Sequence, residues 1–167
     1  MVKKLTQLYE NYASSNKLFK MFSTLYYAPM VKKEICLGAV NRHSNVLFIG
    51  GGPLPMSALL LKRFTGAQVS IVDCNLNAIT KAKNVIQESG VYIQVIHAYG
   101  QDVEVKDYDT IIVAKQVVSQ DVVFKHLINK ANPKTKIILR HRLQTHSLRE
   151  WLSQATYQDI DVYASSN

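Results

Sequence analysis

Cysteine, long apolar runs and hydrolase motifs are scarce or missing in this chain of 167 residues. Its two cysteines, Cys36 and Cys74, are too few for a disulfide framework or a metal cluster, and we expect both to be reduced packing residues. No apolar stretch approaches the roughly 20 residues of a membrane span, and the first residues lack the apolar core of a secretory signal. We therefore expect a soluble, cytoplasmic protein with no membrane partner.

The histidines are too dispersed to predict a metal site. The five histidines form no i, i+4 pair on a helix and no close cluster with cysteine, so we expect no metal ligands. The sequence also has no Gly-x-Ser-x-Gly elbow, and no Ser/His/Asp arrangement can be argued from it. Nucleophilic hydrolysis is therefore not supported.

Charge is distributed unevenly along the chain, whose formal net charge is +8. Residues 1–63 hold nine Lys/Arg against two acids, residues 64–124 four against seven, and residues 125–167 seven against three. The acidic middle would suit a cationic cofactor, and the basic flanks could attract an anionic substrate or RNA. A solvated basic surface without a partner is the default interpretation of the flanks.

From residue 45 onward, short apolar runs alternate with helical patterns, which predicts parallel strands joined by helical crossovers. We expect one α/β unit over residues 45–167, with a doubly wound, mostly parallel, Rossmann-like sheet and a truncated C-terminal strand pair. The expected strands are 45–49, 68–72, 92–97, 109–114, 136–140 and 160–163, and the expected helices are about 54–64, 75–90, 119–132 and 147–154.

The first 44 residues are expected to form a helical cap. Apolar residues recur at helical spacing over residues 1–27, Pro29 interrupts the pattern, and residues 30–40 predict a second helix. The apolar faces of these helices must dock, most simply over the mouth of the sheet.

A glycine loop follows the first expected strand. The run Gly50-Gly51-Gly52-Pro53-Leu54-Pro55 opens a helix, and Asp73 closes the next strand twenty-three residues after Gly50. This spacing is typical of a nucleoside-cofactor site in which a carboxylate binds ribose hydroxyls. The two prolines remove N–H groups that a pyrophosphate would need, which favours a phosphate-free nucleoside such as S-adenosyl-L-methionine. An NAD-type site and a tight turn without a ligand are the alternatives.

Residues that follow the second and third strands are further candidate cofactor contacts, because ligands bind outside the carboxyl ends of such strands. Cys74 and Asn75 follow the second strand, and Asn75 is better explained as a helix cap. Gln101 or Asp102, after the third strand, could accept a hydrogen bond from an adenine amino group, beside Gly100, which permits close backbone approach. A polar surface turn is the alternative there.

After the fourth strand, the small side chain of Ala114 would let a cofactor lie flat. Lys115 or Gln116 could then face the acceptor, although a solvated lysine is equally plausible.

Residues 46–55, Asp73, Gln101-Asp102 and residues 108–114 together resemble the class I S-adenosylmethionine-dependent methyltransferase fold. The Gly-Pro-Leu-Pro run is similar to the loop of nicotianamine synthases, which carry an aromatic residue where ordinary methyltransferases keep an acid; here that residue is Phe48. Asn132-Pro133 and Ile138-Leu139-Arg140 extend the resemblance to about residue 142.

The resemblance implies S-adenosyl-L-methionine as cofactor and transfer of an aminopropyl or methyl group to a small amine or other metabolite. It leaves the catalytic residues unassigned, because neither Tyr9-Glu10-Asn11-Tyr12 nor Tyr26-Tyr27 matches the spacing of the family's N-terminal segment. Tyr27 is a candidate for a lid over the cofactor, with packing on the core as the favoured alternative.

Two other functions stay open: an RNA methyltransferase, suggested by the basic flanks, and a cofactor-binding protein without catalysis. A bare edge on the fifth expected strand would invite pairing. We therefore expect either residues 160–163 or a second copy of the chain, in a homodimer, to lie beside it.

Overall fold

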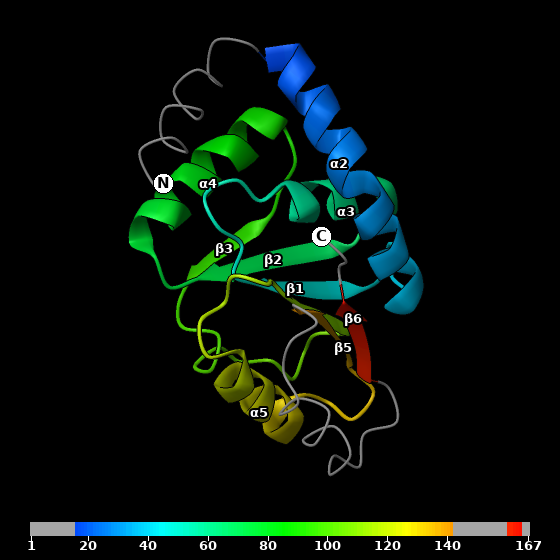
Figure 1. Cartoon of the computed structure of the whole chain (residues 1–167), viewed down its shortest axis with the longest axis vertical. Coiled ribbons are helices and arrows are strands. Elements are labelled where there is room, and N and C mark those ends of the chain that lie inside the picture. The colour runs from blue at the N-terminus through cyan, green and yellow to red at the C-terminus, as the bar shows by residue number, and fades with distance from the viewer. Residues whose placement is uncertain (1–15, 142–159, 165–167) are drawn as a thin grey trace.

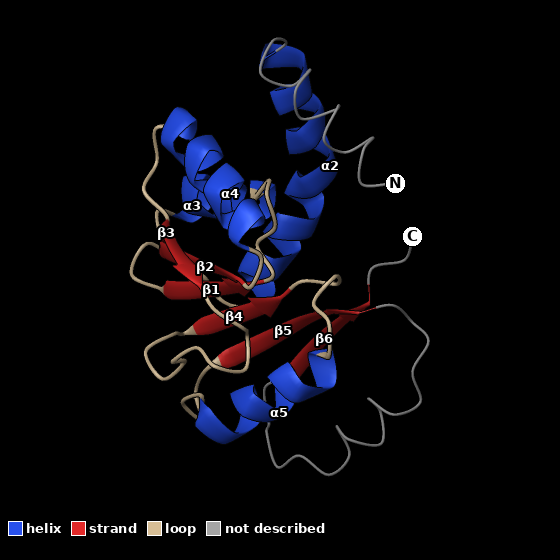
Figure 2. Ribbon diagram, turned by 90° about the vertical axis from the view of Figure 1, so that its left-hand side faces the viewer, coloured by secondary structure: helices blue, strands red, loops and turns tan. Residues whose placement is uncertain are grey.

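The computed structural model describes residues 16–141 and 160–164. Its centre is a six-stranded sheet of order β3-β2-β1-β4-β5-β6 in which every neighbouring pair is parallel (Figure 1 and Figure 2). The strands are β1 (Asn45–Ile49), β2 (Gln68–Asp73), β3 (Gln94–His97), β4 (Thr110–Val113), β5 (Lys136–His141) and β6 (Ile160–Ala164). The helices are α2 (Asn16–Leu37), α3 (Met56–Thr65), α4 (Leu76–Ser89) and α5 (Gln120–Lys130). The doubly wound α/β prediction is confirmed.

Helices cover both faces of the sheet, as a parallel sheet requires. Helices α2, α3 and α4 lie on one face, and α5 lies on the other (Figure 2). Alternate residues of β1 supply both layers: Phe48 belongs to the hydrophobic cluster under α3, and Ile49 to the cluster under α5. From β1 the chain builds the sheet outward to one side through β2 and β3, and then to the other side through β4, β5 and β6. The strand order therefore reverses between β1 and β4, and ligands bind at this kind of reversal.

The described part of the helical cap is one continuous helix, so the predicted break at Pro29 is wrong. Proline inside a helix removes one backbone hydrogen bond and crowds the preceding turn. Within the next turn and a half, however, Val31 and Glu34 are completely buried, and α2 packs along α3. The tertiary packing of α2 therefore outweighs the local cost of the proline. The helical patterns predicted before residue 16 and at 147–154 lie outside the described residues.

Strand β6 confirms the prediction of a strand near residue 160, and it runs parallel to β5. The pairing extends from Ile137 opposite Ile160 to His141 opposite Ala164. It occupies the edge of β5 through which we expected a homodimer, so a second copy could pair only with β6 at this end of the sheet. The homodimer itself stays a prediction. Among the described residues, no helix is long and apolar enough to cross a membrane.

Candidate functional site

Four neighbouring strands reach the carboxyl edge of the sheet with their residues in one row. Val72, Ile49, Val113 and Leu139 lie opposite one another in register. The next residue on each strand therefore begins the edge where ligands bind in doubly wound sheets. These four residues are Asp73, Gly50, Ala114 and Arg140.

The glycine loop needs glycine because of its neighbours as well as its backbone. The amides of Gly50 and Gly51 both donate to the carbonyl of Val72, which folds the loop against the end of β2. Gly50 has a φ of 84°, and a Cβ there would lie 2.5 Å from Cγ2 of Val117. A Cβ on Gly51 would lie 3.1 Å from Cβ of Ile71. Side chains at these positions would push the glycine loop away from β2 and from residues 114–119, the β4 loop.

The carboxylate of Asp73 fixes the same loop from the other side. Its Oδ2 accepts a hydrogen bond of 2.8 Å from the amide of Gly52, and its Oδ1 accepts one of 2.9 Å from the amide of Asn75. Each oxygen keeps a second lone pair that can accept from a ligand hydroxyl. Asp73 therefore joins the glycine loop to the start of α4 at the edge of the sheet.

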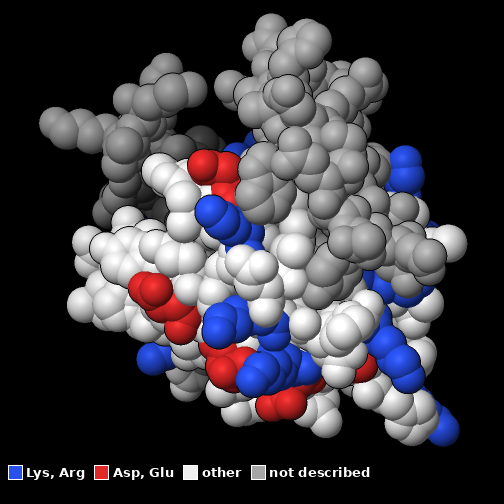
Figure 3. All heavy atoms as spheres, turned by 90° about the horizontal axis from the view of Figure 1, so that it is seen from below, with Lys and Arg blue, Asp and Glu red and all other residues white. Residues whose placement is uncertain are grey.

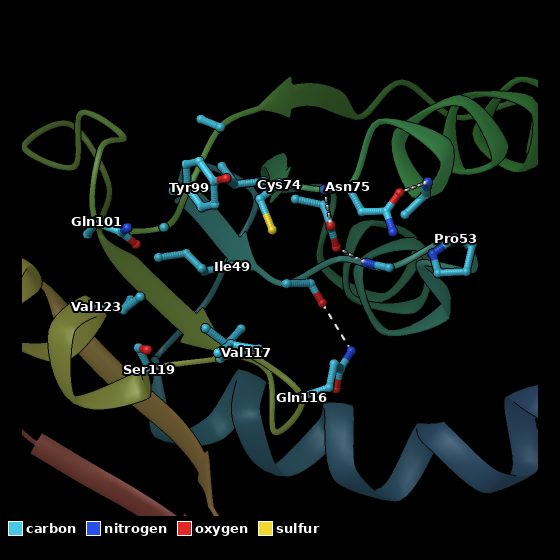
Figure 4. Close-up of a pocket in the computed structure, with 18 residues that line it drawn as sticks. Ile49, Pro53, Cys74, Asn75, Tyr99, Gln101, Gln116, Val117, Ser119 and Val123 are labelled. Atoms are coloured by element: carbon cyan, nitrogen blue, oxygen red, sulfur yellow. Dashed lines mark hydrogen bonds between the residues drawn. The ribbon is translucent and has the colours of Figure 1, made fainter. Parts of the chain in front are cut away.

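A cavity of about 440 Å³ lies over this edge (Figure 4). Tyr99 and Cys74 stand on one side of it, with Gln116 and Val117 across from them, and Ile49 lies between. The side chain of Gln116 spans the β4 loop and the glycine loop, because its Nε2 donates to the carbonyl of Gly50 at 3.2 Å. Nine residues that the sequence pointed to line the cavity: Gly50, Gly52, Pro53, Asp73, Cys74, Asn75, Gly100, Gln101 and Gln116.

Asn75 has two roles in this arrangement. Its side-chain oxygen accepts from the amides of Asn77 at 2.9 Å and Ala78 at 3.2 Å, so it caps α4 as predicted. It also lines the cavity.

Five other expected contacts do not reach the cavity wall that the described residues form: Gly51, Asp102, Ala114, Lys115 and Tyr27. Gly51 faces Ile71, and Ala114 is buried under the loop, with its amide bonded to the carbonyl of Ile49. The backbone amide of Asp102 closes a turn onto the carbonyl of Tyr99. Tyr27 packs against the core and meets Tyr26 edge to face at 5.0 Å between ring centres, which is the alternative that we favoured for it.

Tyr99 and Val117, which had no expected role in the site, line the cavity, and so does Ser119, which we expected as a helix cap. The signal available was their position directly after β3 and β4. Cys36 and Cys74 are free thiols, as expected, but their interpretation as packing residues is wrong, because both are exposed. Cys74 lines the cavity instead.

Glu34 had no expected role from the sequence pattern. This side chain is completely buried on α2, and its carboxylate pairs with the guanidinium of Arg140 at the end of β5. Within the described parts of the chain, no group of three or more His, Cys, Asp or Glu side chains could hold a metal ion.

Comparison with known families gives one match over almost the whole chain. The model of the nicotianamine synthase protein family matches residues 8–165.

Among curated proteins, the chain is similar to L-histidine 2-aminobutanoyltransferases. It is 25% identical over 114 residues to the enzyme of Pseudomonas aeruginosa strain UCBPP-PA14, covering 66% of this chain and 43% of that protein. It is 28% identical over 112 residues to the enzyme of Yersinia pestis, covering 66% and 42%. The chain therefore spans less than half the length of these relatives.

Solved structures give the same picture of the fold. A crystal structure of an MtNAS mutant in complex with S-adenosylmethionine superposes with a TM-score of 0.71 at 26% identity, over 80% of this chain and 54% of that one. MtNAS in complex with MTA and tNA gives 0.70 at 26% identity, over 78% and 52%. An RNA methyltransferase from Salinibacter ruber in complex with S-adenosyl-L-homocysteine gives 0.60 at 16% identity, over 69% and 76%, a likeness of fold alone.

Proposed function

This chain belongs to the nicotianamine synthase family, and from that premise we propose that it is an S-adenosyl-L-methionine-dependent transferase acting on a small amine or metabolite. One observation carries the proposal. The cavity of about 440 Å³ lies where the glycine loop and Asp73 meet at the carboxyl edge of a doubly wound sheet. Its volume falls in the range of roughly 300–1,000 Å³ that is usual for small-molecule sites.

The chemistry of the lining supports a phosphate-free nucleoside. Each oxygen of Asp73 accepts one backbone N–H and has a lone pair left for a ribose hydroxyl. The Tyr99 ring, 59% exposed, offers an aromatic surface for an adenine, and the amide of Gln101 can bond the edge of the base. Pro53 contributes no N–H for a phosphate.

The bound cofactor would supply a carbon made electrophilic by a neighbouring sulfonium. The residues of this chain would orient that carbon, exclude water and keep the acceptor amine unprotonated. The apolar side chains of Ile49, Val117 and Val123 line the cavity and make it suited to excluding water.

The aminopropyl type of transfer is the form that we favour over methyl transfer. The relatives named above are aminobutanoyltransferases, and the matched family is that of nicotianamine synthases. We propose an amino acid or a similar small amine as the acceptor.

The function is tested by calorimetric titration with S-adenosyl-L-methionine, followed by incubation with the cofactor and single amino acids, histidine included. We expect binding and then accumulation of methylthioadenosine, the product of aminopropyl transfer. Accumulation of S-adenosylhomocysteine would indicate methyl transfer instead. Binding without either product would support the non-catalytic alternative, and the absence of binding would contradict the proposal.

The role of Asp73 is tested by Asp73→Ala. We expect cofactor binding to weaken by about 1.5–3 kcal/mol, the usual value of hydrogen bonds to a charged group. Asp102→Ala is the matched control, because Asp102 is a nearby acid that does not line the cavity. Equal affinity of Asp73→Ala and the wild type in calorimetry would remove the ribose contact.

An RNA substrate has less support. On the face shown in Figure 3, Lys and Arg side chains lie beside Asp and Glu side chains, so this part of the described surface presents both signs of charge. Binding of RNA that weakens steeply with salt would revive that alternative.

A further inference from the structure

We infer that the buried ion pair between Glu34 and Arg140 is a positioning device through which helix α2 sets the geometry of the loops around the cavity. The inference rests on the proposed function for its ligand. Glu34 and Arg140 lie outside the cavity wall, and Glu34 belongs to α2.

The pair has a fork geometry. Nε of Arg140 donates to Oε1 of Glu34 at 2.6 Å, and Nη2 donates to Oε2 at 2.9 Å. The side chain of Glu34 is 0% exposed and that of Arg140 is 13% exposed. The guanidinium also lies over the ring of Phe48, 5.7 Å from its centre. Two parallel charge-assisted bonds and one aromatic face allow one arrangement of α2 on the sheet.

Stability alone does not account for such a pair. Removing two charges from water costs several kcal/mol per ion, and apolar side chains of similar volume often stabilise a protein as well or better. The hydrophobic cluster on this face of the sheet includes Val31, Ile112 and Ile138, and we expect it to accept such side chains. What the ion pair adds is a fixed register between α2 and β5, which is the best-supported use of buried charges.

Hydrogen bonds and one short stretch of backbone connect Arg140 to the cavity. The backbone carbonyl of Arg140 accepts from Nε2 of Gln120 at 3.2 Å, and the same nitrogen donates to the carbonyl of Ala114 at 2.8 Å. Ala114 begins the loop that carries Gln116, whose Nε2 bonds the carbonyl of Gly50. A shift of Arg140 would therefore be transmitted to the ends of β4 and β1.

The position of Arg140 in the sheet strengthens this argument. Ile49, Val113 and Leu139 lie in one register row of the sheet. Gly50, Ala114 and Arg140 are the residues that follow them. The ion pair therefore holds the same edge of the sheet from which the glycine loop and the β4 loop extend.

The test compares three variants of the intact chain with the wild type: Glu34→Gln, Arg140→Lys and the double variant Glu34→Leu/Arg140→Met. The double variant replaces the pair by apolar side chains and is designed to keep the fold. The matched control is Thr135→Val, which removes a buried hydrogen bond of 2.7 Å to the carbonyl of Tyr108 at the opposite edge of the sheet.

Two measurements distinguish positioning from simple stabilisation. The first is amide hydrogen exchange of residues 50–52 and 115–119 without any ligand, and the second is the Kd of S-adenosyl-L-methionine. We expect faster exchange in both loops and a roughly 2- to 30-fold higher Kd in Glu34→Gln and in the double variant. Arg140→Lys keeps the charge without the fork and should give a smaller effect. Thr135→Val should lower the melting temperature and change neither measurement.

The inference would be overturned if the double variant and Glu34→Gln had the same loop exchange and the same Kd as the wild type. If the double variant does not fold, Glu34→Gln and Arg140→Lys still decide it. Failure of the proposed function would look different, because the wild type would not bind the cofactor while the effect on loop exchange persisted.

Discussion

Residues of the glycine loop lie against two different neighbours. Gly50 faces Val117 of the β4 loop, whereas Gly51 faces Ile71 of β2, and both approaches are too close for a methyl group without movement. The backbone of the glycine loop therefore packs directly between β2 and the β4 loop, where there is no room for side chains. Larger side chains here would reduce the cavity by displacing its walls.

Substitution of Gly50 by alanine tests this at the residue scale. We expect a loss of stability of about 1–3 kcal/mol from the overlap with Val117, in addition to the cost of a positive φ, and weaker cofactor binding. Gly90→Ala is the matched control, because Gly90 has a φ of 71° and nothing within 4 Å of a Cβ. It should lose about 1–2 kcal/mol and keep its affinity. Urea unfolding measures the stability of both variants, and calorimetry measures their affinity for the cofactor. Equal affinity in the two variants would contradict the prediction.

The sequence predicted some residues of the site well and others poorly, for a physical reason. Asp73 and the glycines are fixed by strand, loop and helix spacing, which local sequence determines. Whether Ala114 or Val117 faces the cavity depends on the backbone angles of the β4 loop, which no spacing rule gives. The pairing of Glu34 with Arg140 joins residues 106 positions apart, and only the fold brings them together.

Helix α4 and helix α5 begin differently, although each follows a polar residue. Asn75 caps α4 through its side chain, whereas Ser119 has a φ of 57° and makes no side-chain capping bond to a described residue. Asn75→Ala should therefore cost about 1 kcal/mol of stability, and Ser119→Ala should leave stability within about 0.5 kcal/mol of the wild type. Urea unfolding at one pH measures both. Equal losses would show that the capping bond does not stabilise α4.

Pro29 provides a second prediction at the scale of the element. Proline costs about 3 kcal/mol relative to alanine inside a helix, and its stiffness in the unfolded chain offsets up to about 1 kcal/mol. Pro29→Ala should therefore stabilise the protein by about 2 kcal/mol in urea unfolding. A lower stability of this variant would mean that the proline ring itself contributes to the packing of α2.

The bounds of the strands and of most helices in the α/β unit could be predicted from the sequence to within about two residues. The strands of a covered parallel sheet are short apolar runs, and the predicted β1 at residues 45–49 has the bounds of the structure. Helix α2 was misjudged because a local rule for proline competes with packing on α3, which a sequence pattern does not contain. The direction of β6 likewise depends on the path of the chain before it.

For the whole molecule, β6 decides which edge the sheet offers to other proteins. Removal of residues 160–167 would expose the backbone of β5, and a bare edge recruits another chain. We expect the shortened protein to form dimers or larger species in light scattering at concentrations where the full chain keeps one size. A shortened protein with the size of a monomer would contradict this prediction.

The parallel arrangement of all six strands has a consequence for how the chain reaches its native state. In the described sheet, no neighbouring strands are joined by a tight hairpin, so each pairing waits until a distant segment has arrived. Proteins built from such long-range pairings fold slowly for their size, because the entropy of closing each loop is lost before any pairing compensates for it. Refolding of this protein should accordingly take milliseconds to seconds, and its unpaired strands are open to association with other chains during that interval.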